Sequence, residues 1–126
     1  DDSGWQTKYL LVLTCTTDDL VYRLLTSHAH GRPEQPPCYH GNPYPGFYLG
    51  IIGGTLGAKS WLDLRQQDDY DRQTFAAHTA EGFLTLETAL TQALLCAALD
   101  CAANADDTTR RQSRLMRDER IRQGCT

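Results

Sequence analysis

The residues best suited to chemistry in this chain are three histidines and a cysteine that lie close together in the sequence. They are His28, His30, Cys38 and His40. Imidazole nitrogens and a thiolate are ligands that zinc accepts, and one loop can bring them together. Their spacing matches none of the usual zinc-finger or hydrolase patterns. Two readings therefore remain: a metal site, and with it a metal-dependent enzyme, or a surface loop with incidental histidines and a disulfide-bonded Cys38.

Two other positions carry groups that can exchange protons. His78 and Glu81 are three residues apart on an expected helix, which suits an acid/base pair or an ordinary helix-surface contact. Asp100 falls in an apolar segment, where it needs a partner unless it meets solvent at a helix end. The sequence contains no Gly-x-Ser-x-Gly, Walker or Cys-x-x-Cys motif. We therefore assign no catalytic residue, expect no cofactor, and favour binding over catalysis.

The five cysteines point to an oxidising compartment. The disulfide candidates are Cys15, Cys38, Cys96, Cys101 and Cys125. One or two bridges are expected, with at least one thiol left over. Cys96 and Cys101 are five residues apart on an expected helix, about 140° around its axis, so they should not pair with each other. The chain begins without Met or an apolar leader. We therefore predict a processed protein that is secreted, or alternatively one sent to an organelle after loss of a transit segment.

Composition and charge indicate one soluble domain spanning residues 1–126. The chain has a net charge of -4 and a hydrophobic fraction of 40%, which gives no strong nucleic-acid signal. The charge is uneven, because residues 105–126 carry six Arg and four acidic residues. This Arg-rich C-terminal helix or tail is either a solvated helix face or a docking surface for an acidic partner. Its binding candidates are Arg110, Arg114 and Arg117.

The segment 29–45 is a long proline-rich loop. It contains all five prolines, which exclude a helix or a central strand. Long loops inside compact domains are usually functional or wrapped on the surface. Tyr39 and Tyr44 are expected to be exposed there, and with His40 they are candidates for binding, since tyrosine offers a large contact area with few rotatable bonds. The alternative is that the prolines only route the chain across one face of the domain.

The glycine-rich segment 46–58 has two interpretations. Glycines recur every fourth residue, a spacing that lets membrane helices touch, so membrane contact through 46–58 is one. The apolar run Phe47–Ala58 is shorter than the roughly 20 residues of a bilayer span. Gly53-Gly54 also suits the turn of a hairpin, with at least one positive φ. We favour the hairpin, with strands over 47–52 and 55–64.

The remaining pattern predicts an α+β fold, in which a small sheet of about three strands packs on a long buried helix in the order β-α-β-β-α-α. Residues 9–15 form an apolar run typical of a central strand. Residues 20–28 are expected to be helical behind the capping residues Thr16–Asp19. A main helix is expected over 74–103, with core residues Leu90 and Leu94 in its body, 83–103. A last helix over 110–123 is expected to be anchored by Leu115, Met116 and Ile121.

Three functions fit these features. The first is a processed, secreted binding or effector protein, toxin-like, that recognises another protein or a cell-surface component. The second is an accessory structural subunit of a larger complex, which is either membrane-associated or not. Its contacts within the complex would be made by the glycine repeat, the apolar helix and the Arg-rich tail. The third is the metal-dependent enzyme built on the His/Cys loop.

Overall fold

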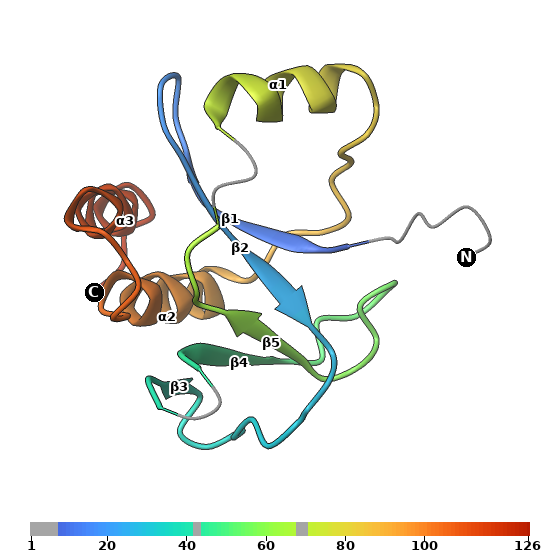
Figure 1. Cartoon of the computed structure of the whole chain (residues 1–126), viewed down its shortest axis with the longest axis vertical. Coiled ribbons are helices and arrows are strands. Elements are labelled where there is room, and N and C mark those ends of the chain that lie inside the picture. Colours follow the sequence, from blue (N-terminus) through green and yellow to red (C-terminus); the bar gives the residue numbers. More distant parts are fainter. Residues whose placement is uncertain (1–7, 42–43, 68–70) are drawn as a thin grey trace.

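The computed structural model describes residues 8–41, 44–67 and 71–126. In this part of the chain, one antiparallel sheet is accompanied by three helices (Figure 1). The strands are β1 (Leu10–Cys15), β2 (Leu20–Thr26), β3 (Cys38–Tyr39), β4 (Gly46–Gly50) and β5 (Ser60–Asp63). The helices are α1 (Arg72–Ala80), α2 (Gln92–Ala103) and α3 (Arg110–Arg122). The α+β class is confirmed. The sheet has five strands, however, and all of them precede the helices.

The N-terminal half of the sheet is a β1–β2 hairpin, so the expected helix over 20–28 was wrong. The amide of Thr16 donates to the carbonyl of Asp19 at 2.9 Å, and the Asp19 amide donates back to the Thr16 hydroxyl at 3.2 Å. The polar residues that resembled a helix cap therefore close a tight turn. β2 then pairs with β1 on one side and with β5 on the other, in the order β1-β2-β5-β4-β3. β1 is a strand, as predicted, but it lies at the edge of the sheet and not at its centre.

The β4–β5 hairpin confirms the interpretation of the glycine-rich segment. β4 pairs with β5, and the connection 51–59 carries positive φ at Gly53 (112°) and Gly54 (59°). The strands are shorter than predicted, because pairing ends at Gly50 and resumes at Ser60. Segment 46–58 is thus strand and loop, not a helix that could touch another helix in a bilayer. No helix in the described part of the chain is long and apolar enough to cross a membrane.

The core lies between one face of the sheet and the helices α2 and α3 (Figure 1). Its most buried side chains include Leu13, Val21, Leu62, Leu64, Leu99 and Met116. The expected main helix was wrong in extent, since residues 81–91 form an irregular connection between α1 and α2. Thr91 caps α2 by accepting a hydrogen bond from the Leu94 amide. Leu90 and Leu94 are partly buried against the core, so they contribute to it from its margin.

The last helix matches its prediction closely. α3 has a capping box at Thr109 and Gln112, and it buries Met116. Leu115 packs partly against the core, whereas the expected anchor Ile121 is 78% exposed.

Two disulfides fix α2, one to the sheet and one to the C-terminal segment. Cys38 is bonded to Cys101, which joins β3 to α2. Cys96 is bonded to Cys125, which joins α2 to the segment after α3. Cys15 is a free, exposed thiol. The predicted leftover thiol and the exclusion of a Cys96–Cys101 pair are therefore confirmed.

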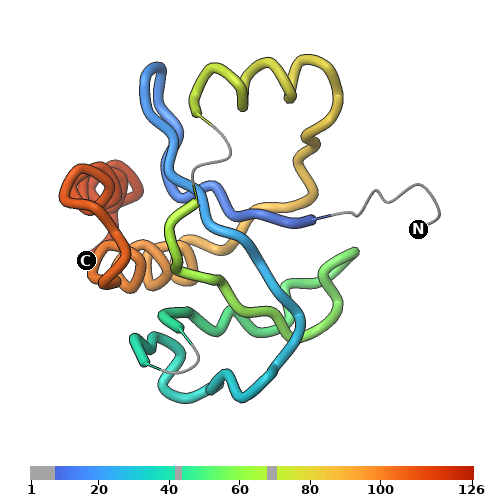
Figure 2. The backbone as a smooth tube through the Cα atoms, in the orientation of Figure 1, coloured from blue at the N-terminus to red at the C-terminus, as the bar shows by residue number. Residues whose placement is uncertain are grey.

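The proline-rich loop lies across the face of the sheet opposite the helices. Trp61 alternates in β5 with the core residue Leu62, so its side chain is on that opposite face. On this face the indole N–H of Trp61 donates to the carbonyl of Pro33 at 2.8 Å. At the edge of the sheet the amide of Tyr48 donates to the carbonyl of Pro37 at 2.9 Å, which extends the pairing of β3 with β4. Figure 2 shows the chain passing from the end of β2 around to β4. The loop therefore packs over Trp61 on the face of the sheet opposite the helices.

Candidate functional site

An open cleft of about 520 Å³ is lined by residues of β2 and β5, by the loop 51–59 and by the two residues before β1. Three segments and five single residues line it: Lys8 and Tyr9, Leu24–His28, Thr55 and Leu56, with Tyr44, Ala58, Ser60, Asp63 and Arg65. The cleft thus combines charged, aromatic and apolar side chains. Such a mixture is typical of a site that recognises a ligand or a partner surface.

The charged part of the cleft is an ion pair at the end of β5. Arg65 Nη2 is 2.7 Å from Asp63 Oδ2, and Arg65 Nε is 3.0 Å from Asp63 Oδ1. The backbone amide of Arg65 also donates to Asp63 Oδ1, at 2.9 Å. Asp63 is buried, whereas 55% of the Arg65 side chain is exposed. The hydrogen bonds that the Arg65 guanidinium donates to Asp63 raise the pKa of Arg65. The carboxylate is therefore fully occupied in fixing one guanidinium at the surface.

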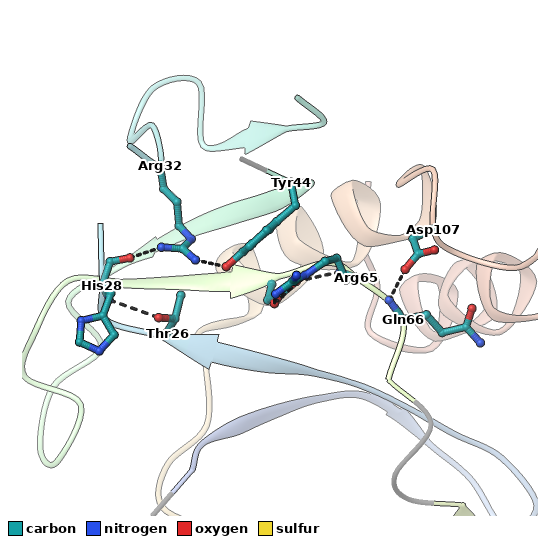
Figure 3. Close-up of polar contacts among 8 residues, drawn as sticks. Thr26, His28, Arg32, Tyr44, Arg65, Gln66 and Asp107 are labelled. Carbon is teal, nitrogen blue, oxygen red and sulfur yellow. Dashed lines mark hydrogen bonds and ion pairs between the residues drawn. The ribbon is translucent and has the colours of Figure 1, made fainter. Parts of the chain in front are cut away.

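Two arginines flank Tyr44 (Figure 3). The guanidinium carbon of Arg65 lies 3.9 Å from the centre of the Tyr44 ring, and that of Arg32 lies 4.8 Å away. Arg32 also donates hydrogen bonds to the Tyr44 hydroxyl and to the carbonyl of His28. Contacts of this kind hold the ring and both cations in one arrangement. Because all of these contacts lie within the chain itself, between residues 28–44 and Arg65, the arrangement is preformed.

An exposed apolar segment lies beside this cleft. We call residues 81–91 the apolar arm. Phe83 is 69% exposed and Leu86 is 90% exposed, although both are large apolar residues. The arm follows α1, which stands apart from α2 and α3 in Figure 1 and buries none of its residues. The amides of Phe83 and Leu84 donate to the carbonyl of His78, and the Phe83 ring lies 5.6 Å from the His78 ring. The start of the arm is therefore held in place by α1.

One hydrogen bond joins the arm to the cleft. The hydroxyl of Thr55 donates to Glu87 Oε2 at 3.0 Å. Thr55 lines the cleft, and the same loop carries Ile51, which is 64% exposed. The cleft, the loop 51–59 and the apolar arm are thus connected, and we refer to them together as the recognition surface.

The structure does not assemble the four expected metal ligands. Among the described residues, one group of three possible ligands lies within 4.8 Å: Cys38, His40 and Cys101. Two of these are the halves of a disulfide, so their sulfur atoms are not free to bind a metal in this form. His28 and His30 are outside the group, with their rings 5.4 Å apart, and His28 lines the cleft.

The other expected groups divide between buried and exposed positions. The expectation that Tyr39 is exposed was wrong, since it is 8% exposed and burial raises the pKa of its hydroxyl. Tyr44 is half-buried in the cleft, and His40 is exposed. Asp100 meets solvent and pairs with Arg120 at 3.5 Å. The three expected binding arginines, Arg110, Arg114 and Arg117, are exposed along α3.

Sequence reasoning missed several members of the recognition surface. Phe83 and Leu86 were assigned to a buried helix, and Arg32, which contacts Tyr44 of the cleft, was not among the expected binding residues. Asp63 was detectable from the alternation in β5, which places it on the face opposite Leu62, whereas Arg65 lies beyond the end of that strand. The chain matches no protein-family model, no curated protein and no solved structure.

Proposed function

We propose that this protein is a disulfide-bonded recognition domain that binds another protein through its recognition surface. The observation that carries the proposal is the exposure of Phe83 and Leu86 on an arm that borders a preformed cleft. Large apolar side chains grouped on a surface commonly mark a protein-interaction site. The nine-residue helix α1 supports the same view, because a helix this short gains little stability without packing.

The side chains present are those that dominate protein interfaces. Aromatic residues and arginine are enriched among the residues that contribute most to binding. Here Phe83 supplies an apolar anchor, while Tyr44 and Arg65 supply a polar part with a fixed geometry. A rigid arrangement loses little conformational entropy when a partner binds. A partner with an apolar patch next to an acidic or carbonyl-rich group fits this surface best.

Recognition accounts for the charged groups of the cleft better than catalysis does. Asp63 accepts hydrogen bonds from the amide and the guanidinium of Arg65, so it is a poor candidate for a general base. The two disulfides favour an exported protein, because such bridges persist in oxidising compartments. We therefore propose secretion, with the partner being a protein or another component of a cell surface.

Capture of the partner with matched variants tests this function. The wild-type protein, the double variant Phe83→Ser/Leu86→Ser and the control Ile121→Ser are each immobilised and mixed with extracts and surface fractions of the source organism. Ile121 is a suitable control because it is equally apolar and 78% exposed, but on α3. The free energies of unfolding of the three proteins should agree within about 0.5 kcal/mol, as is usual for surface variants.

The expected result is a partner recovered by the wild type and by Ile121→Ser but lost with the double variant. With the partner purified, the double variant should bind at least about 30-fold more weakly, which corresponds to the loss of one hot spot. Equal recovery by all three proteins would place the interface elsewhere and contradict the proposal.

A further inference from the structure

Three possible metal ligands converge where β3 meets α2. The ligand atoms of Cys38, His40 and Cys101 all lie within 4.8 Å of one another, and His40 Nε2 is 3.5 Å from Cys38 Sγ. Cys101 is buried, Cys38 is half-buried and His40 is exposed. The group therefore has a protein-facing side and a side open to solvent.

The separations in this group suit a tetrahedral metal. Zinc bonds of about 2.3 Å to sulfur and about 2.0–2.1 Å to nitrogen place neighbouring ligand atoms about 3.5 Å apart. The distance between His40 Nε2 and Cys38 Sγ already has this value. The two sulfur atoms, which are bonded to each other in the disulfide, need to separate. Cys38 is in a two-residue edge strand that pairs with β4 alone, so it can move more easily than Cys101 in the middle of the core.

We propose that reduction of the Cys38–Cys101 disulfide converts this group into a zinc site with Cys38, Cys101 and His40 as ligands. Two thiolates and one imidazole suit Zn²⁺, whereas Mg²⁺ and Ca²⁺ prefer oxygen ligands. The exposed side leaves a fourth position for water. The disulfide and the zinc site use the same sulfur atoms, so the two forms exclude each other and the redox state selects between them.

The redox step balances with a small thiol as the reductant. Two thiol molecules are oxidised to one disulfide, the Cys38–Cys101 bond breaks, and one hydrogen is added to each cysteine sulfur. Zinc then displaces both protons to solvent as it binds. In the experiment below, a water-soluble phosphine replaces the thiol: it takes oxygen from water, and the two hydrogens of that water end on the cysteine sulfurs.

Alkylation mapping of the whole wild-type chain tests the proposal directly. The protein is reduced with phosphine, incubated with or without Zn²⁺, and treated with iodoacetamide, and the modified peptides are identified by mass spectrometry. Zinc should protect Cys38 and Cys101, at one metal ion per chain, while the other three cysteines are modified. Equal modification with and without zinc would overturn the proposal, and so would protection centred on Cys96 and Cys125.

The zinc affinities of two histidine variants provide a second test. Zinc affinity of the reduced protein, measured by competition with a coloured chelator, should fall at least about tenfold in His40→Ala and stay unchanged in His30→Ala. His30 is a matched control because it belongs to the same loop but not to the group. Circular dichroism follows the fold, and zinc should restore any structure lost on reduction. Equal affinities of the two variants, or a reduced chain that zinc leaves unfolded, would contradict the site.

Discussion

Removal of the Cys96–Cys125 disulfide should lower the free energy of unfolding substantially. This bridge closes a chain separation of 29 residues and holds the segment after α3 against α2. In the chain-entropy model, a loop of this length corresponds to about 3.6 kcal/mol. The Cys38–Cys101 bridge spans 63 residues, and the same model gives about 4.3 kcal/mol. Because the dependence on loop length is logarithmic, the two losses should differ by only about 0.7 kcal/mol.

Urea unfolding of three variants measures these quantities. The variants are Cys96→Ser/Cys125→Ser, Cys38→Ser/Cys101→Ser and the control Cys15→Ser, which removes only the free, exposed thiol. The control should match the wild type within about 0.5 kcal/mol. In both double variants the free energy of unfolding should also fall more steeply with urea concentration, since their unfolded chains expose more surface. A loss below about 1 kcal/mol for either bridge would refute the reasoning that these bridges act by constraining the unfolded chain.

Three further predictions test the core, a turn and the partly exposed ion pair of Glu119 with Arg122. Leu99→Ala should cost about 2–5 kcal/mol in urea unfolding, and Leu94→Ala should cost less because Leu94 is only partly buried; equal losses would contradict the assigned core. Gly54→Val should cost roughly 1–2 kcal/mol, because Gly54 has a φ of 59°, and an unchanged stability would exclude this turn. Burial raises the pKa of Glu119, but hydrogen bonds from Arg122, Gln123 and Thr14 outweigh it and lower the pKa overall. Its stabilising contribution should therefore be present above the unfolded pKa of about 4.3 and be lost as the pH falls through the lower folded value, which an acid titration of the wild type against Glu119→Gln will show.

The parts of the fold that were predictable carry short-range signals. Gly53-Gly54 requires no distant contact to specify a turn, and Thr109 with Gln112 marks the start of α3 locally. The segment 20–26 was misassigned because its leucine spacing fits a helix as well as a strand, and only pairing with β1 and β5 decides between them.

The recognition surface was also difficult to predict, because it depends on contacts between residues far apart in the sequence. The apolar residues of 83–91 suggested burial, yet Phe83 and Leu86 are exposed because the helix begins only after Thr91. The contacts of Tyr44 with Arg32 and Arg65 depend on how the proline-rich loop meets β5, which is a tertiary arrangement. The disulfide partners likewise depend on the packing of α2 and not on spacing.

Hydrogen exchange of the protein with and without its captured partner tests the central claim most directly. The amides of the apolar arm, 81–91, and of the loop 51–59 should exchange more slowly in the complex, while those of α3 should not change. This result would establish the recognition surface as the interface. Protection confined to α3, with its exposed Arg110, Arg114 and Arg117, would contradict the account and assign binding to the Arg-rich helix.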